Sequence, residues 1–405
     1  MLGELTIEEC AAVERALAAE GMVRRVELWS EINSGSTNLP GLGLVAGSIA
    51  DCFSALPGEL QLREAAPVTA IDVAGQEVAV AHGAHLHLKV RPEAPIQILL
   101  TGHMDTVYPA DHPFQCLDWQ SEDVLVGPGV ADMKGGLAVM LAALKAVEAD
   151  PGASGVLGYE VVINSDEEVG SPSSAALLVE AARGKAAALT YEPSSLPDGT
   201  LAGARPGSGN FSFVISGRSA HAGRNPEDGR NAVIAAADLA LRLRQLTDHG
   251  LSVNVARLDG GGPNNVVPDR AILRVNFRPQ NAALQARAEA GIAAAVAAVI
   301  AEHEVELVSH GGFGRPPRPM TNELTRLFGL VRQAGEDLGQ TIAWRASGGV
   351  CDGNNIAACG VPVVDTMGVR GGKIHSSEEY LIVSSLGERA ALSALTIMRL
   401  AGGWR

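Results

Sequence analysis

The sequence has little of several features that would mark a specialised class of protein. Aromatic residues make up only 4% of its 405 residues, so a platform of stacked rings for single-stranded nucleic acid is not expected. Positive charge is also scarce, with 31 Lys and Arg against 46 Asp and Glu and a formal net charge of −15. Because nucleic-acid binding draws on clustered cations, we expect no nucleic-acid partner.

Cysteines and long apolar runs are few as well. No CxxC pair occurs, which argues against a disulfide framework and favours free thiols in a reducing, cytoplasmic compartment. The first twenty residues are acidic where a secretory signal would carry a basic region and an apolar run. The longest apolar stretch, around Gly291–Ala301, is shorter than the roughly 20 residues that span a bilayer, so we expect no membrane partner. The cysteines are Cys10, Cys52, Cys116, Cys351 and Cys359.

Hydrophobic patterning predicts alternating helices and strands. Helices are expected over 7–33 and 38–56, and a short apolar run at 96–100 indicates a buried strand. Later strands at 159–164 and 187–191 are each separated by helical segments. This alternation is typical of an α/β fold, in which helices cover both faces of a mixed, mostly parallel sheet.

The middle of the chain has a different rhythm. Between the turn-forming segment PGSG at 206–209 and the Gly- and Pro-rich stretch 311–319, the elements are predicted in the order β-α-β-β-α-β. That order is the ferredoxin-like pattern. We therefore expect one domain made of residues 1–205 and 315–405, with residues 206–314 inserted into it as an α+β domain.

Polar residues with metal-binding chemistry follow the predicted strands. In TGHMDTVYP, His103 comes after strand 96–100 and Asp105 lies two residues on. Open α/β sheets carry their sites at the carboxyl ends of strands, and a metal-bound histidine usually donates its second ring N–H to a carboxylate. Taken alone, however, His103 is better explained as a structural histidine.

The segment INSDEEVGS sets three acids in a row. Asp166, Glu167 and Glu168 follow strand 159–164, and adjacent carboxylates repel unless they are exposed or bound to a cation. A solvated charge run is the usual explanation of such a triplet. At a strand's carboxyl end, one glutamate could instead ligate a metal while its neighbour faces a reacting water.

Three more positions complete the pattern. Asp132, in GPGVADMKGG, precedes a helix and alone could be an N-cap. Glu192 follows strand 187–191, and His375 lies in the glycine-rich GGKIHSSEEYL. Two histidines and three carboxylates together suit a two-zinc site with one bridging carboxylate. Metals about 3.5–4 Å apart can hold and acidify a water, with Glu167 as the general base. The five ligands would be His103, Asp132, Glu168, Glu192 and His375.

With these motifs in order, residues 20–400 or so resemble the zinc metallopeptidase family of glutamate carboxypeptidase, succinyl-diaminopimelate desuccinylase, acetylornithine deacetylase and aminoacylase. The similarity is greatest to glutamate carboxypeptidase. The resemblance implies a zinc-peptidase-like domain with an inserted lid that dimerises. It implies that Asp132 bridges two Zn²⁺, with Co²⁺ or Mn²⁺ as substitutes, and is followed by a cis peptide. One zinc would take His103 and Glu192, the other Glu168 and His375, with Glu167 as the base and Asp105 orienting His103.

The resemblance extends to the inserted domain. His221, in SAHAGRNPEDG, resembles a histidine that reaches the partner subunit's site and steadies the oxyanion. Asn265 resembles a lid asparagine near the substrate. Arg278 resembles an arginine that pairs with the substrate carboxylate through a bidentate fork, although an ion pair within the lid is an alternative for Arg278.

One loop departs from the relatives. Residues 347–354, SGGVCDGN, stand where glutamate carboxypeptidases carry a GGTDA-like loop, so the loop should line the pocket and alter its specificity. A nucleophilic thiol at Cys351, paired with His375, is disfavoured because His375 is better used as a ligand.

The expected reaction is hydrolysis of an amide bond beside a free carboxylate, in a small peptide or an acyl-amino acid. An N-acyl-amino-acid deacylase of the acetylornithine or succinyl-diaminopimelate type is the alternative within enzymes. A catalytically silent binding protein on the same scaffold is the alternative of another class.

Overall fold

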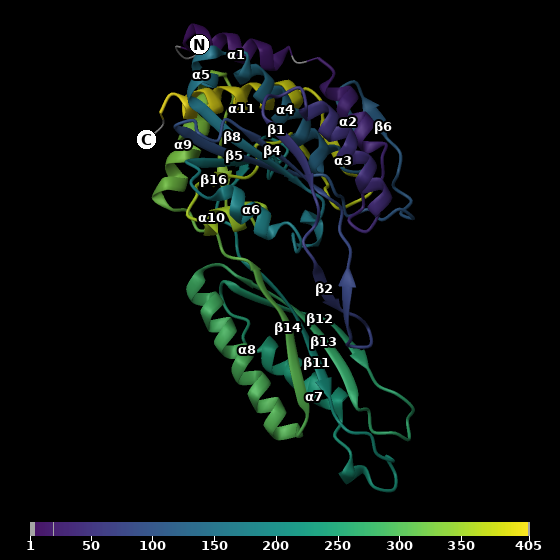
Figure 1. Ribbon diagram of the computed structural model, residues 1–405. Coiled ribbons are helices and arrows are strands. Elements are labelled where there is room, and N and C mark those ends of the chain that lie inside the picture. Colours follow the sequence, from purple (N-terminus) through teal and green to yellow (C-terminus); the bar gives the residue numbers. More distant parts are fainter. Residues whose placement is uncertain (1–4, 19, 404–405) are drawn as a thin grey trace.

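The structure is a computed structural model that describes residues 5–18 and 20–403. Two bodies are stacked along its length (Figure 1). The larger body holds a six-stranded mixed sheet, in which β1–β4–β8 are antiparallel neighbours and β8–β5–β9–β16 are parallel neighbours. In spatial order the strands are β1 (Glu59–Arg63), β4 (His85–Val90), β8 (Leu157–Asn164), β5 (Ile96–His103), β9 (Ala187–Thr190) and β16 (Val363–Val364).

Helices cover both faces of this sheet because its central strands are apolar on both sides. In β5, Ile98 and Leu100 belong to the main core, whereas Leu99 between them faces a second cluster. Alternate residues of a strand point to opposite faces, so an uninterrupted apolar run needs a covering layer on each face of the sheet. The main core is built with α1 (Ile7–Leu17), α2 (Met22–Ser30), α3 (Leu39–Phe53), α4 (Gly136–Glu148), α9 (Asn322–Asp337) and α11 (Ser385–Ala401), and the second with α6 (Ala175–Ala182) and α10 (Asp352–Ala358).

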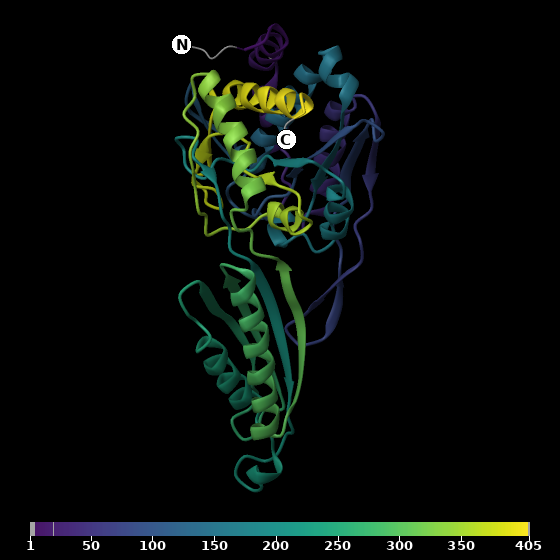
Figure 2. The same ribbon diagram turned by 90° about the vertical axis from the view of Figure 1, so that its left-hand side faces the viewer.

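The smaller body, called the lid unit below, is a four-stranded antiparallel sheet in the order β12–β13–β11–β14. This order is the ferredoxin-like arrangement that the β-α-β-β-α-β pattern predicts. Helices α7 and α8 cover one face of the sheet (Figure 2). The elements of the lid unit are β11 (Ser208–Ser216), α7 (Ala232–Arg244), β12 (Leu251–Gly260), β13 (Arg270–Pro279), α8 (Ala282–His303) and β14 (Glu306–Arg315).

The other face of the lid sheet is contacted by a hairpin from the larger body. Strands β2 (Val68–Ile71) and β3 (Glu77–Val80) form this hairpin, which reaches down to the lid unit (Figure 1). Arg274 donates hydrogen bonds to the carbonyls of Ile71 at 3.0 Å and Asp72 at 2.9 Å. The hairpin is therefore a third connection between the bodies, beside the two chain crossings.

Smaller elements complete the larger body. They are α5 (Pro151–Val156), the pair β10 (Leu201–Ala202) and β15 (Trp344–Arg345), and a four-stranded sheet of β17 (Gly371–Gly372), β18 (Tyr380–Ile382), β7 (Val124–Val126) and β6 (Asp118–Ser121).

Two predicted segments have different boundaries in the structure. The single helix expected over 7–33 is wrong, because Gly21 adopts a left-handed φ of 74° between α1 and α2, a conformation that glycine accepts easily. The segment expected as a linker from Gly311 instead continues β14 to Arg315, with Gly311 paired opposite Phe211. The crossing between the bodies therefore begins only at Pro316.

Helix α8 corrects the expectation that no apolar stretch is long enough for a membrane. By length and composition alone it could cross one, with a mean hydropathy of 1.4 over its most apolar 18 residues. In the structure it packs on the lid sheet, with Ala288, Ile292, Ala295 and Val299 buried at helical spacing. Many of its other positions are alanines, which raise the mean hydropathy of the helix. The helix therefore needs only one buried face.

A partly buried cluster of ionisable groups in the central sheet gives a stability prediction. The Glu160 carboxylate contacts His87 Nε2 at 2.6 Å and Lys185 Nζ at 2.8 Å. Burial raises the pKa of Glu160, but these hydrogen bonds outweigh it and lower the pKa to about 2 from 4.5. The interaction thus stabilises the fold above pH 4.5 and is lost as the pH falls toward 2.

Accordingly, Glu160→Gln should lower the free energy of unfolding of the metal-free protein by about 1–3 kcal/mol at pH 7. Between pH 4.5 and pH 2 the variant should lose less stability than the wild type, because it lacks the carboxylate that must be protonated. Urea unfolding at pH 7 and pH 3 measures both quantities. An identical pH dependence in the two proteins would contradict the assignment.

Candidate metal centre

His103 ends the central strand β5 and is almost fully buried. Its Nδ1 lies 3.0 Å from the Asp105 carbonyl and 3.3 Å from Asp105 Oδ1, which turns Nε2 toward the site. Asp105 also accepts hydrogen bonds at 3.2 Å from the backbone N–H groups of Glu167 and Glu168. One buried carboxylate therefore fixes both the histidine and the acidic loop that follows β8.

The acidic triplet divides into three roles. Asp166 points away from the site and accepts hydrogen bonds from the hydroxyl and backbone N–H groups of Ser173 and Ser174, which tie the loop to α6. Glu167 and Glu168 turn the other way, toward the cavity described below. The triplet is thus not the solvated charge run that its composition alone would suggest.

Asp132 lies in the turn η1 (Val130–Gly135) before α4, and the Asp132–Met133 peptide is cis, as predicted. The turn is held by Glu379, a buried acid that the sequence analysis did not single out. Glu379 accepts hydrogen bonds from the backbone N–H groups of Gly129, Ala131 and Asp132 at 3.0–3.2 Å. The only available signal was its place in HSSEEY, four residues after His375.

Two donor groups meet at Asp132. Its Oδ1 lies 3.1 Å from His103 Nε2, which is 3.7 Å from a Glu192 oxygen. Its Oδ2 lies 3.3 Å from His375 Nε2, which is 3.2 Å from a Glu168 oxygen. The structure therefore brings all five predicted ligands together, in two sets that share Asp132. Nitrogen and carboxylate donors in two such sets fit a pair of zinc ions.

Burial and hydrogen bonding shift the pKa values of several acids and bases at this site. Hydrogen bonds with Asp132 and Glu168 raise the pKa of His375 to about 11. Burial raises the pKa of Glu168 to about 8 and that of Glu167 to about 7. Because a metal must displace protons from its ligands, its affinity should fall as the pH falls.

Beside this cluster lies a cavity of about 510 Å³. Residues 347 and 349–351 line it, as expected for the loop that departs from the relatives. The Cys351 thiol is buried and donates to Asp365 Oδ2 at 3.2 Å. Burial raises the thiol pKa well above its ordinary value, which argues against a nucleophilic thiolate. The lining includes Asp132, Glu167, Glu168, Glu192 and His375.

Comparison with known proteins agrees with this geometry. The sequence profile of "Peptidase family M20/M25/M40" matches residues 99–399, more than half of the chain. The protein belongs to this family. Carboxypeptidase G2 from Pseudomonas sp. (strain RS-16) is 32% identical over 78% of this chain and 76% of its own length. Succinyl-diaminopimelate desuccinylase from Pseudomonas syringae pv. tomato is 28% identical over 76% of this chain and 83% of its own.

The fold agrees as well. A tripeptidase structure from Staphylococcus aureus has a TM-score of 0.70 at 22% identity, covering 96% of this chain and 99% of that one. The protein is thus an M20 metal-dependent hydrolase with peptidase and amidohydrolase relatives.

In this M20 hydrolase, two predicted lid residues lie together but far from the candidate metal ligands. The backbone N–H of Ala222 donates to the Asn265 carbonyl, and His221 pairs with Val266 in an isolated bridge. Both loops leave the far ends of their strands, since Ser216 pairs with Arg270 while Ser208 pairs with Arg315 at the crossing. Nine residues of β11 span about 30 Å.

Arg278 lies elsewhere, at the near end of β13. Its guanidinium donates to the Asn276 side chain at 3.1 Å and to the Gly348 carbonyl at 3.1 Å. It lines a second cavity, which shares Arg205 and Ser347 with the cavity beside the donor sets. Within residues 5–18 and 20–403 it makes no ion pair with a carboxylate, so the alternative of an ion pair within the lid is not observed.

Proposed function

We propose that the protein is a dinuclear zinc hydrolase that cleaves an amide bond beside a free carboxylate, in the manner of a carboxypeptidase or dipeptidase. The observation that carries the proposal is the pair of donor sets meeting at Asp132, with a fourth acid, Glu167, beside them. Glu167 has oxygens close to donor atoms of His103 and Glu192. It is free to act as a base because the other five residues already supply both sets.

The side chains divide the reaction among them. His103 and Glu192 would hold one zinc ion, Glu168 and His375 the other, and Asp132 both. When bound, the two ions supply polarisation of the water and of the amide carbonyl. Glu167 takes a proton from the attacking water and returns it to the leaving amine. Asp105 keeps His103 in the tautomer that presents Nε2 to the site.

The position of His221 supports a homodimer. The loop that carries it is too far along the lid unit to reach the metal ligands of its own chain, yet His221 is exposed. We propose that the partner subunit's His221 donates a hydrogen bond to the oxyanion, with Asn265 in the same lid loop pair near the substrate. Arg278 would engage the substrate carboxylate once the lid unit closes over the cavity.

Subunit complementation tests this dimer. His221→Ala and Glu167→Ala should each be nearly inactive, whereas refolding the two as a 1:1 mixture should restore about one quarter of wild-type activity. Half of the randomly formed dimers contain one chain of each variant. Each of these mixed dimers has one intact site, in which Glu167 of one subunit meets the partner's His221, and one inactive site. His249→Ala, an exposed lid histidine at the other end, should stay fully active alone. Mixed dimers that form but recover no turnover would contradict the sharing.

A hydrolysis panel tests the proposed function itself. It contains Ala-Glu, N-(4-aminobenzoyl)-glutamate, N-acetylornithine and N-succinyl-diaminopimelate, each with a counterpart whose carboxylate beside the scissile amide is a carboxamide. Zinc-restored protein should cleave the first two and spare the carboxamides, as mass spectrometry of the products would show. Cleavage of only the last two would favour the deacylase alternative. No cleavage by protein with two bound zincs would favour a silent binding protein.

The five cysteines are all free in the structure. Free thiols persist in reducing compartments, which supports our proposal that the enzyme works in the cytoplasm.

A further inference from the structure

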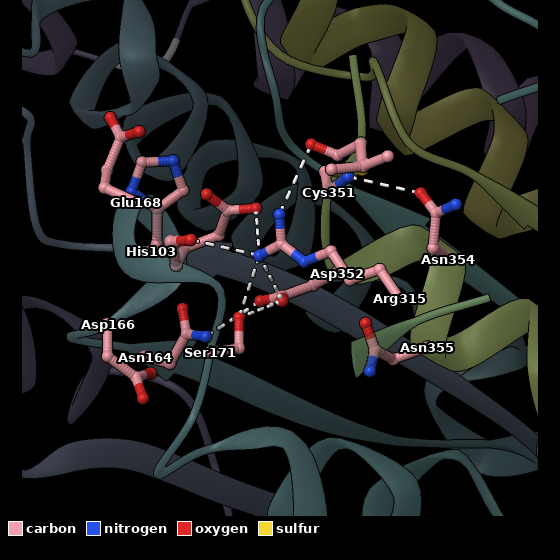
Figure 3. A network of polar contacts seen from close by, with 12 residues as sticks. His103, Asn164, Asp166, Glu168, Ser171, Arg315, Cys351, Asp352, Asn354 and Asn355 are labelled. Atoms are coloured by element: carbon pink, nitrogen blue, oxygen red, sulfur yellow. Dashed lines mark hydrogen bonds and ion pairs between the residues drawn. The ribbon is translucent and has the colours of Figure 1, made fainter. Parts of the chain in front are cut away.

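A buried cation lies where the lid unit joins the larger body. Arg315 is the last residue of β14, paired with Ser208 at the start of β11. Its side chain points into the larger body, where it is 7% exposed. Figure 3 shows its guanidinium amid a network of polar groups that includes Ser171 and Asp352. The strand that leaves the lid unit therefore ends in a buried arginine beside the candidate metal ligands.

Most contacts of the Arg315 guanidinium are with the loop that carries Glu167, the proposed general base. Arg315 Nη2 lies 2.7 Å from Glu167 Oε1, a close ion pair that is not aligned as a hydrogen bond. The same nitrogen donates to the Glu167 carbonyl at 3.0 Å and to Ser171 Oγ at 3.0 Å. One guanidinium thus holds the side chain of Glu167, its backbone and the end of its loop.

The remaining contacts of Arg315 fix the guanidinium from the opposite side. Asp352, at the start of α10, lies 3.3 Å from Nη2, and the Val350 carbonyl accepts from Nη1 at 3.4 Å. Asp352 is also hydrogen-bonded by the hydroxyl of Ser171 and the amide of Asn164. Because each partner is itself fastened, Arg315 has little freedom to move away from Glu167.

The geometry distinguishes this role from substrate binding. Glu167 lines the cavity, but Arg315 is not among the lining residues. In the described part of the chain, the Glu167 carboxylate has no other ion-pair or hydrogen-bond partner. A base must be held close to its productive geometry, and a misplacement of about 1 Å can cost roughly a hundredfold in rate.

We propose that Arg315 is a positioning residue that holds Glu167 in its working orientation and links it to the end of the lid strand. The proposal rests on the function proposed above, in which Glu167 is the general base. It assigns Arg315 no contact with the substrate and no share in metal binding.

The test compares Arg315→Met and Arg315→Lys with wild type, using whichever of the four panel compounds the wild type cleaves fastest. Arg315→Met should lower kcat by about 10- to 100-fold, with KM within about threefold and two zincs retained. Arg315→Lys should recover part of kcat, since an ammonium can pair with Glu167 but cannot span all the partners. A rise in KM with unchanged kcat would instead assign Arg315 to the substrate.

Two further readouts separate positioning from general stabilisation. Arg399→Met is the matched control, because Arg399 also bridges two carboxylates, those of Glu9 and Asp337, away from the cavity. It should lower the melting temperature without lowering kcat. In a double-mutant cycle, Arg315→Met should add little to the loss already caused by Glu167→Ala.

Hydrogen exchange measured on the metal-free protein needs no turnover. Amide exchange in residues 166–171 should accelerate in Arg315→Met and not in Arg399→Met. Unchanged exchange there, or full kcat in Arg315→Met while Glu167→Ala is inactive, would overturn the proposal. Wild-type protein inactive on the whole panel would count against the proposed function instead.

Discussion

Glu167→Ala is expected to lower kcat by about 10²–10⁴-fold while the protein keeps two zinc ions per chain. The reason is that Glu167 lines the cavity and has oxygens near donor atoms of His103 and Glu192, while the five proposed ligands form both donor sets without it. Its loss removes the proton acceptor for the attacking water and the proton donor for the leaving amine. Turnover of the panel compound that the wild type cleaves fastest, together with zinc content by mass spectrometry, measures the effect.

The matched control for this prediction is Glu180→Ala. Glu180 is an exposed glutamate on α6 that pairs loosely with Lys89 at 3.9 Å, so its removal should leave kcat unchanged. Activity retained in Glu167→Ala would show that Glu167 is not the general base. Loss of zinc in the same variant would mean that Glu167 is a ligand, as its proximity to His103 and Glu192 also permits.

Asp132→Ala is expected to lose both metal ions and with them all activity above the blank. The two oxygens of the Asp132 carboxylate face two different histidines, His103 and His375. Removing it takes a ligand from each set and leaves the remaining carboxylates to repel one another. Zinc content after dialysis against buffer of defined free zinc is the measurement.

The comparison variant for Asp132 is His375→Ala. His375 belongs to only one donor set, so this variant should retain about one zinc per chain, held by the set that contains His103 and Glu192. Retention of both metals in Asp132→Ala would show that the two sets do not share a bridging carboxylate. Equal loss in both variants would show that the two sites fill only together.

The meeting of the five candidate ligands could be predicted in part because three of the sequence motifs follow recognisable strands. His103 ends β5, Glu192 follows β9 closely, and the acidic triplet follows β8. Parallel strands bring their carboxyl ends to one edge, so three sequence motifs converge on one place without any knowledge of side-chain contacts.

The supporting residues could not be predicted in the same way. Glu379 contacts backbone groups that lie 247 to 250 residues earlier in the chain, and Arg315 contacts Glu167, 148 residues earlier. No periodicity or local spacing in the sequence signals such pairs. The position of Arg315 in a strand was also not predicted, because its segment, GGFGRPP, has the composition of a linker. Pairing with β11 extends it as a strand nonetheless, so tertiary hydrogen bonds override local turn preference.

The lid residues show a third limit. Alternation along β13 buries Ala271, Leu273 and Val275 against the helices and turns Arg274 and Arg278 to the opposite face. A single chain contains the pattern for this sheet. The same pattern does not tell which site His221 serves, because the loop that carries it lies at the far end of the sheet from the donor sets of its own chain.

A zinc titration of metal-free wild-type protein, with turnover of the fastest panel compound followed at each step, tests whether the reaction needs both donor sets. We predict that turnover is absent without metal and reaches its maximum at two equivalents of zinc per chain. Full turnover in thoroughly metal-depleted protein, or the same titration curve in Asp132→Ala, would contradict a reaction that depends on the donor sets meeting at Asp132.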